Sequence, residues 1–133
     1  MERKKLFTGF GDGGLSGLLG KGRFSKSNER FEALGSIEEL AAFLGIVKVS
    51  IENDSIGLEI ISIQKALYRL MADISYMSTS REEKYYLHAE DMAALEMRID
   101  NLSTDLVIPD KFLIPGDTAS SALVDFARTL ARK

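Results

Sequence analysis

The sequence has no cysteine and only one histidine, His88, among its 133 residues. Without cysteine the chain can form no disulfide, no thiolate nucleophile and no thiolate-based zinc site. One imidazole is too few for a histidine-ligated metal centre, and we expect His88 to lie in a solvated loop or in the first turn of a helix. We therefore predict no metal-ligating side chains.

Long apolar runs are missing as well. The basic start MERKKLF is not followed by the apolar core of a secretion signal, and no later segment reaches the ~20 apolar residues of a membrane span. This pattern favours a soluble cytoplasmic protein that contacts no membrane. The net charge of −3 and the pI of about 5.2 make nucleic acid an unexpected partner, although a local anion pocket is compatible with this balance.

Glycine is concentrated near the N-terminus, where seven of the eleven glycines lie in TGFGDGGLSGLLGKGRFSK, residues 8–26. Because glycine has no Cβ, successive backbone N–H groups can turn toward an anion without steric cost. Lys26, with Arg23 and Lys21 nearby, supplies positive charge. The stretch predicts a phosphate-binding loop, although its composition alone is also typical of a flexible N-terminal arm.

Common phosphate motifs do not describe this loop. Residues 9–14 spell GxGxxG, but the dinucleotide fingerprint also requires a strand before it and a crossover helix after it, and neither is predicted. A Walker loop requires GxxxxGK followed by serine or threonine. Here Lys21 is followed by Gly22, and Leu15 stands where the first glycine belongs.

Four segments after the loop have the three- and four-residue apolar spacing of a helix face. These apolar positions are Phe31, Leu34, Ile37, Ala41, Leu44 and Val47; Ile56, Ile60, Ile63, Leu67, Leu70, Met71 and Ile74; Met92, Leu95, Ile99 and Leu102; and Ala119, Ala122, Leu123, Phe126, Ala127 and Leu130. Four helices with short connections predict one all-α domain, an up-and-down helical bundle. Residues 1–26 would be its glycine-rich nucleotide-binding segment and residues 27–133 the bundle.

The ends of the helices are less strongly marked. Ser27 suits the N-cap of the first helix, whereas the run from Ser36 to Glu39 would be a capping box if that helix began later. Residues 53–55 mark a turn before the second helix, and Asp117 suits the N-cap of the fourth.

Three connecting segments carry their own expectations. Leu6 and Phe7 would anchor the chain before the glycine loop. The run STSREEKYY, from Ser78 to Tyr86, has charge and no periodicity, which favours a mobile loop. Residues 106–116 contain both prolines and an apolar trio around Phe112, so we expect an ordered loop there.

Four separated blocks of the chain resemble the PduO-type ATP:cob(I)alamin adenosyltransferases. The blocks are TGFGDGG with Lys26, FEALGSIEELAAFLG at 31–45, KFLIPGD at 111–117 and ARTLARK at 127–133. Their order and spacing extend the resemblance over nearly the whole chain. The resemblance implies a ferritin-like bundle in which a fifth helix would follow Lys133. It also implies an enzyme that transfers the 5′-deoxyadenosyl group of ATP to the cobalt of a reduced cobalamin or related corrinoid and releases triphosphate.

The resemblance assigns roles to the C-terminal cations. Arg128 and Arg132 are four residues apart, so both can converge on phosphate oxygens, although basic residues are also ordinary at a helix C-terminus. The family segment R-x-x-x-R-R implies that Arg132 and Lys133 bind the triphosphate. Glu38 stands where the family has an aspartate that pairs with the arginine matched by Arg128, which makes Arg128 and Glu38 the implied catalytic pair.

The resemblance also assigns ATP contacts to the N-terminal segment. The implied residues are Thr8, Gly9, Phe10, Gly11, Ser16, Gly17 and Lys26. Gly9 and Gly13 replace family lysines, and losing each charge-assisted contact would cost on the order of 1 kcal/mol or more. Magnesium would accompany ATP through the phosphate oxygens and water.

Phe112 matches the family phenylalanine that covers the lower face of the corrin, excludes the axial ligand and leaves four-coordinate cobalt; by pattern alone it would be a core aromatic. The implied assembly is a homotrimer with its sites between subunits, served by a reductase or an adenosylcobalamin-dependent enzyme. Two alternatives remain open: a catalytically silent relative that binds nucleotide or corrinoid, and a purely structural bundle.

Overall fold

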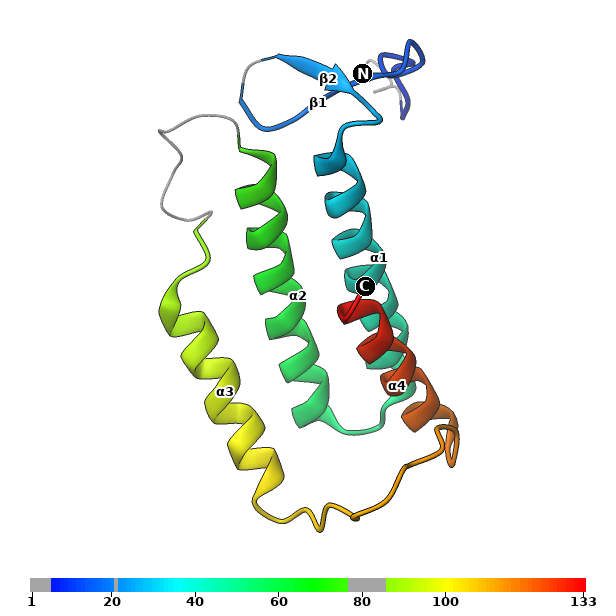
Figure 1. The fold of residues 1–133 in the computed structure, drawn as a ribbon, viewed down its shortest axis with the longest axis vertical. Coiled ribbons are helices and arrows are strands. Elements are labelled where there is room, and N and C mark those ends of the chain that lie inside the picture. Colours follow the sequence, from blue (N-terminus) through cyan, green and yellow to red (C-terminus); the bar gives the residue numbers. More distant parts are fainter. Residues whose placement is uncertain (1–5, 21, 77–85) are drawn as a thin grey trace, which may run out of the picture.

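The computed structural model describes residues 6–20, 22–76 and 86–133. Its elements are β1 (Leu15–Gly17), β2 (Arg23–Ser25), α1 (Glu29–Ser50), α2 (Asp54–Ser75), α3 (Ala89–Ser103) and α4 (Ala119–Ala131). The helices alternate in direction, with α2 and α4 packed on α1 and α3 lying along the outer side of α2 (Figure 1). The predicted all-α bundle of four helices is confirmed. The mobile loop predicted for residues 78–86 falls, except for Tyr86, outside the described residues.

The core lies where α1, α2 and α4 meet. Leu44, Val47, Ile60 and Ala127 form its buried cluster, and Val47 is only 2% exposed. All four belong to the apolar positions that the helical spacing predicted. Burying one such aliphatic side chain contributes about 1.5–3 kcal/mol, so these three helices carry most of the stability of the fold.

The first two helices begin at asparagine caps. The Asn28 side chain accepts the backbone N–H of Arg30 at 3.0 Å, and the helix runs without interruption through Ser36. Both predicted starts of α1, Ser27 and the later capping box, are therefore wrong, the first by one residue. Asn53 caps α2 in the same way, accepting from the Ile56 N–H at 3.2 Å.

The fourth helix also begins one residue later than predicted. Its N-cap is Thr118 and not Asp117, because the Thr118 hydroxyl accepts the backbone N–H of Ser121 at 3.1 Å. The Ser121 hydroxyl in turn accepts the backbone N–H of Thr118 at 3.1 Å, which completes a capping box.

The third helix is held differently from the others. Two ion pairs join it to α2: Arg69 to Asp91 at 2.6 Å and Arg98 to Glu59 at 2.8 Å. In the described part of the chain it contributes no fully buried residue, and much of its predicted apolar face is exposed because α3 packs only against α2. The expectation for His88 is confirmed, since this exposed residue is the N-cap of α3.

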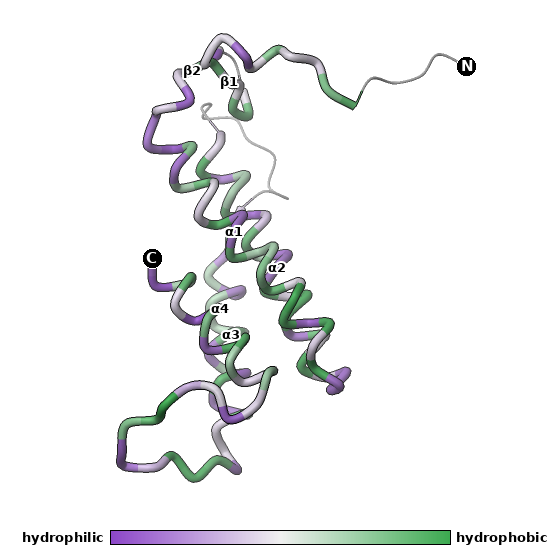
Figure 2. The backbone as a smooth tube through the Cα atoms, turned by 90° about the vertical axis from the view of Figure 1, so that its right-hand side faces the viewer, coloured by the Kyte–Doolittle hydropathy of each residue, from purple (hydrophilic) through white to green (hydrophobic). Residues whose placement is uncertain are grey.

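The segment between α3 and α4 extends away from the helices. Figure 2 shows it as a projecting loop with long hydrophobic stretches. The side chains of Val107, Ile108, Phe112 and Ile114 are between 79% and 101% exposed. Among the described residues, no helix is both long enough and apolar enough to cross a membrane.

Candidate functional site

The N-terminal glycine segment contains a small β-hairpin beyond the N-terminal end of α1 (Figure 1). Strands β1 and β2 are antiparallel, with Leu15 opposite Ser25 and Ser16 opposite Phe24. The sequence did not predict them, because strands of only three residues give almost no alternation signal. The expected anchoring by Leu6 and Phe7 is wrong, since these side chains are 103% and 81% exposed.

The loop before the hairpin is a pair of successive turns and not a free arm. The Asp12 N–H donates to the Gly9 carbonyl at 3.1 Å, and the Gly14 N–H donates to the Gly11 carbonyl at 3.2 Å. Gly9 and Gly14 have φ of 66° and 76°, values that cost a residue with a Cβ about 1–2 kcal/mol. The Lys26 N–H closes the loop onto the hairpin by donating to the Gly14 carbonyl at 2.9 Å.

Two of the predicted ATP-binding residues, Gly11 and Lys26, lie against each other. A Cβ placed on Gly11 would be 3.1 Å from Lys26 Nζ, so the ammonium occupies the space that a side chain would need. The hairpin register causes this contact, because β2 leads Lys26 back to the start of the loop. The result is a positive charge on an exposed turn of glycine backbone, an arrangement suited to an anion.

Arg23 makes the most extensive side-chain contacts in this region. Its Nη2 donates to the Leu15 carbonyl at 2.7 Å and to the Phe10 carbonyl, and its guanidinium carbon lies 3.9 Å from the centroid of the Phe10 ring. The sequence indicated only a nearby positive charge. Lys21, the other cation named there, lies outside the described residues.

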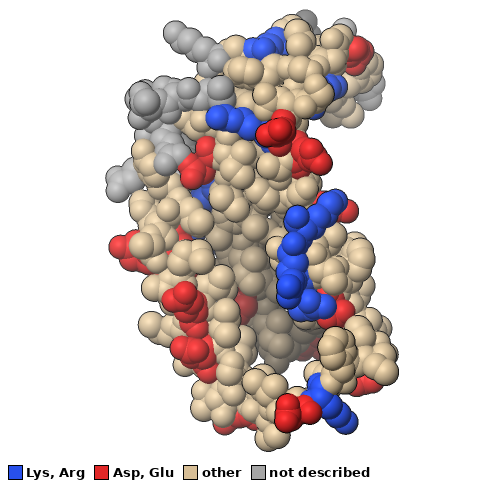
Figure 3. Space-filling model, viewed as in Figure 1, with Lys and Arg blue, Asp and Glu red and all other residues tan. Residues whose placement is uncertain are grey.

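The predicted C-terminal cations gather on α4 and just after it. Figure 3 shows basic side chains in one column over α4. Arg128 Nε donates to Asp125 at 2.9 Å, and Lys133 Nζ donates to Glu39 at 3.2 Å. The ion pair expected between Arg128 and Glu38 is not formed within the described part of the chain; Arg128 uses its neighbour on α4 instead.

Within one chain the predicted site residues lie in three separate regions: the glycine segment, the end of α4 and the loop that carries Phe112. Glu39, which Lys133 contacts, lies about 15 Å along α1 from its first residue, Glu29, at the rise of 1.5 Å per residue. Phe112 lies in the loop at the opposite end of the bundle from the hairpin (Figure 1). It is 101% exposed, so the interpretation of Phe112 as a core aromatic is wrong.

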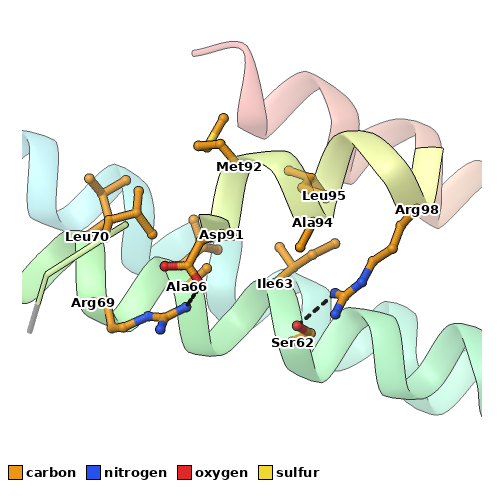
Figure 4. Close-up of a pocket in the computed structure, with 12 residues that line it drawn as sticks. Ser62, Ile63, Ala66, Arg69, Leu70, Asp91, Met92, Ala94, Leu95 and Arg98 are labelled. Carbon is orange, nitrogen blue, oxygen red and sulfur yellow. Dashed lines mark hydrogen bonds and ion pairs between the residues drawn. The ribbon is translucent and has the colours of Figure 1, made fainter. Parts of the chain in front are cut away.

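A cavity of about 220 Å³ lies between α2 and α3 (Figure 4). Its walls are mainly aliphatic, and the Arg69–Asp91 and Arg98–Ser62 contacts cross between the two helices at its ends. The backbone N–H of His88 and the guanidinium of Arg69 lower the pKa of Asp91. None of the predicted site residues lines this cavity.

The sequence model described as cobalamin adenosyltransferase matches residues 6–133. The chain belongs to the cobalamin adenosyltransferase family. Among its relatives is a corrinoid adenosyltransferase of Bacillus subtilis (strain 168), 32% identical over 133 residues that cover 97% of this chain and 67% of that protein. A corrinoid adenosyltransferase of Citrobacter freundii is 33% identical over 130 residues, covering 97% of this chain and 74% of the relative.

Solved structures resemble this family member in fold. A variant PduO-type ATP:corrinoid adenosyltransferase from Lactobacillus reuteri, complexed with cobalamin and ATP, superposes with a TM-score of 0.86 at 27% identity, covering 96% of this chain and 70% of that one. A second variant from the same organism, complexed with ATP, gives a TM-score of 0.84 at 26% identity, covering 96% of this chain and 72% of that one.

For this cobalamin adenosyltransferase family member, sequence reasoning found the loop but missed how the loop is held. Arg23 was named only as a nearby positive charge, because its contacts depend on two carbonyls and a ring that only the folded hairpin brings together. The signal that could have found it is a lone arginine inside a glycine-rich segment, where few other side chains are available to hold the backbone.

Proposed function

We propose that this protein transfers the 5′-deoxyadenosyl group of ATP to the cobalt of a reduced corrinoid such as cob(I)alamin and releases triphosphate. It would do so in the cytoplasm, with an electron supplied by a reductase. The observation that carries the proposal is the contact between Lys26 Nζ and Gly11, which places a cation on a glycine turn in a chain of this family. The complexes of the Lactobacillus reuteri structures with cobalamin and ATP support the choice of substrates.

The protein's share of this reaction is binding, orientation and charge. The reduced cobalt is itself the nucleophile: it bonds to the 5′ carbon of ATP while the bond from that carbon to the triphosphate oxygen breaks. Negative charge then collects on the leaving triphosphate. Lysine and arginine side chains that bind the triphosphate stabilise this charge in the transition state and so lower the barrier.

We assign the nucleotide to two regions. In the N-terminal segment, Thr8, Gly9, Phe10, Gly11, Ser16, Gly17 and Lys26 would contact ATP. At the end of α4, Arg132 and Lys133 would hold the triphosphate, and Arg128 would act in catalysis with Glu38 as its partner. For that role Arg128 must exchange Asp125 for a phosphate or for Glu38; its side chain is 55% exposed and free to do so.

The complete site would lie between subunits of a homotrimer. Three observations support this: the glycine loop and the α4 cations are apart along α1, Phe112 is at the other end of the bundle, and the segment around Phe112 is apolar and exposed. Exposed apolar segments of this kind mark surfaces that another molecule covers. Phe112 would cover one face of the corrin and exclude the axial ligand.

Magnesium would enter with the nucleotide. Among residues 6–20, 22–76 and 86–133 there is no cluster of three aspartate, glutamate or histidine side chains that could hold a metal ion. The ion would therefore be bound mainly by phosphate oxygens and water, as is usual for magnesium nucleotides, and we assign no step to a metal held by the protein.

The test is conversion of chemically reduced cob(I)alamin to adenosylcobalamin with Mg-ATP, followed by absorbance. We expect turnover that depends on the protein, and loss of that turnover in Lys26→Ala. The matched control is Lys48→Ala, which removes one lysine from the last turn of α1, the far end from the loop. Retained ATP binding without any turnover would instead assign the chain as a silent relative, a function favoured by the glycines at positions 9 and 13.

A further inference from the structure

We infer that Arg23 is a positioning residue for the nucleotide loop, acting through the loop backbone and not through contact with ATP. The inference rests on the proposed function for its effect on catalysis. The structural part concerns the loop itself and can be tested without turnover.

The first support is the position of the two carbonyls that Arg23 binds. Phe10 belongs to the turn that begins at Gly9, and Leu15 is the first residue of β1. Arg23 itself is the first residue of β2. One guanidinium therefore ties the glycine turn to both strands of the hairpin, and it fixes a stretch of backbone that has high conformational freedom.

The second support is the ring of Phe10. The side chain is 71% exposed, and the guanidinium of Arg23 lies over its face, with 3.9 Å from Cζ to the ring centroid. This cation–π geometry and the hydrogen bond to the Phe10 carbonyl act on the same residue. Arg23 thereby holds Phe10 by both its backbone and its side chain.

The third support is the effect on the anion-binding face. A trans peptide is planar, so a carbonyl directed at Arg23 makes the N–H of the next residue point the opposite way. With the Phe10 carbonyl held by Arg23, the Gly11 N–H faces away from that guanidinium. Gly11 is also the residue against which Lys26 Nζ lies. Arg23 thus sets the direction of the Gly11 N–H, and Lys26 provides the positive charge beside it.

Lysine would not replace arginine in this role. Lysine keeps the positive charge but lacks the flat guanidinium that bonds two carbonyls while stacking on a ring. If Arg23 contacted phosphate as a simple charge, Arg23→Lys would keep most of the ATP affinity. If Arg23 positions the loop, Arg23→Lys and Arg23→Ala behave alike.

The kinetic test compares these two variants in the adenosyl transfer assay. We expect both to raise the KM for ATP about tenfold, the factor expected for lost charge-assisted hydrogen bonds in an exposed loop, with kcat changed less than about threefold. Lys65→Ala, an exposed charge removal on α2, is the matched control and keeps the KM of the unaltered protein. A Lys variant with unaltered KM beside a defective Ala variant would overturn the inference.

The structural test uses amide hydrogen exchange measured by NMR on the full chain. The reporters are the N–H groups of Asp12, Gly14 and Lys26, which close the turns. We expect exchange to be about tenfold faster or more in both Arg23 variants. In Lys26→Ala we expect unchanged exchange at Asp12 and Gly14, because this variant removes a charge but keeps the Arg23 guanidinium. Unchanged exchange in Arg23→Ala would overturn the inference. Because this readout needs no substrate, it distinguishes failure of the positioning role from failure of the proposed activity.

Discussion

Two irregular segments in the described part of the chain are held in opposite ways. The N-terminal loop and hairpin are fixed by their own hydrogen bonds, by Arg23 and by the contact of Lys26 with Gly11. Between Val107 and Asp117, in contrast, no hydrogen bond is formed within the described part of the chain, and the apolar side chains there face outward. The first segment is organised inside one chain, whereas the second is exposed and makes no such contacts of its own. This contrast fits the roles proposed above: nucleotide binding by a loop that is already ordered, and corrin binding by a segment that would be completed on assembly.

The largest expected effect is at Phe112. Phe112→Ala should lower the rate of adenosyl transfer about 100-fold, because an aromatic contact with the corrin is worth about 2–3 kcal/mol. It should leave the Tm unchanged, since the side chain is 101% exposed. The matched control is Phe126→Ala on α4, whose ring packs edge-on against Phe43 at 4.8 Å and whose loss should lower the Tm. A drop in Tm for Phe112→Ala would show that the segment around Phe112 is packed within the chain, against the contrast drawn above.

Arg128 gives the next largest effect. Arg128→Ala should reduce kcat about 30-fold with the fold intact, the size expected when a charge-assisted contact to the triphosphate is lost. Asp125→Asn weakens only the partner that holds Arg128 in the free chain, so its kcat should not fall. Full activity in Arg128→Ala, followed by the same absorbance assay, would exclude Arg128 from the catalytic role assigned to it.

Gly11 tests the organised segment directly. Gly11→Ala puts a methyl group 3.1 Å from Lys26 Nζ, closer than an ordinary contact, and should raise the Kd for ATP about tenfold by displacing that charge. Gly13→Ala is a closely matched control, because a Cβ at Gly13 meets nothing within 4 Å and the residue does not have positive φ. Isothermal titration with Mg-ATP measures both. Equal affinities for the two variants would show that the Lys26 contact has no part in binding.

The smallest effect concerns pH. Asp91 has a pKa lowered below its ordinary value of 3.8 by the His88 N–H and by Arg69, so it stabilises the α2–α3 contact when ionised. That stabilisation is fully present above pH 3.8 and is lost as the pH falls through the lowered pKa. NMR shifts of α3 should therefore move in acid before those of α1, and Asp91→Asn should remove this early change. If the NMR shifts of α3 still moved first in Asp91→Asn, the change would come from the titration of another group.

The helices that share the core were predictable from their apolar spacing. Periodicity marked α1, α2 and α4 correctly because the same residues that recur along a helix face form the buried cluster. It also marked α3, but it could not tell that α3 would lie at the edge of the bundle. The N-caps of α1 and α4 were missed by one residue because Ser27 and Asn28, like Asp117 and Thr118, are adjacent residues that are both good caps.

The candidate site was predictable in its residue types and not in its contacts. Spacing and resemblance indicated Gly11 and Lys26, but their contact depends on a hairpin of three-residue strands and on glycines with positive φ. The pairing of Arg128 with Asp125 depends on side-chain competition along α4, which sequence order does not fix. Arg23 was indicated only as a charge, because its two carbonyl partners are backbone groups and carry no sequence signal.

The attachment of α3 through two partly exposed ion pairs makes this helix sensitive to salt. At an ionic strength of 1 M the Debye length falls to about 3 Å, and attractions between exposed charges weaken, whereas burial of apolar side chains does not. Concentrated salt should therefore loosen α3 from α2 while α1, α2 and α4 stay packed. Because α3 leads directly into the segment that carries Phe112, a rise in ionic strength would change the segment proposed to bind the corrin before it changes the loop proposed to bind the nucleotide.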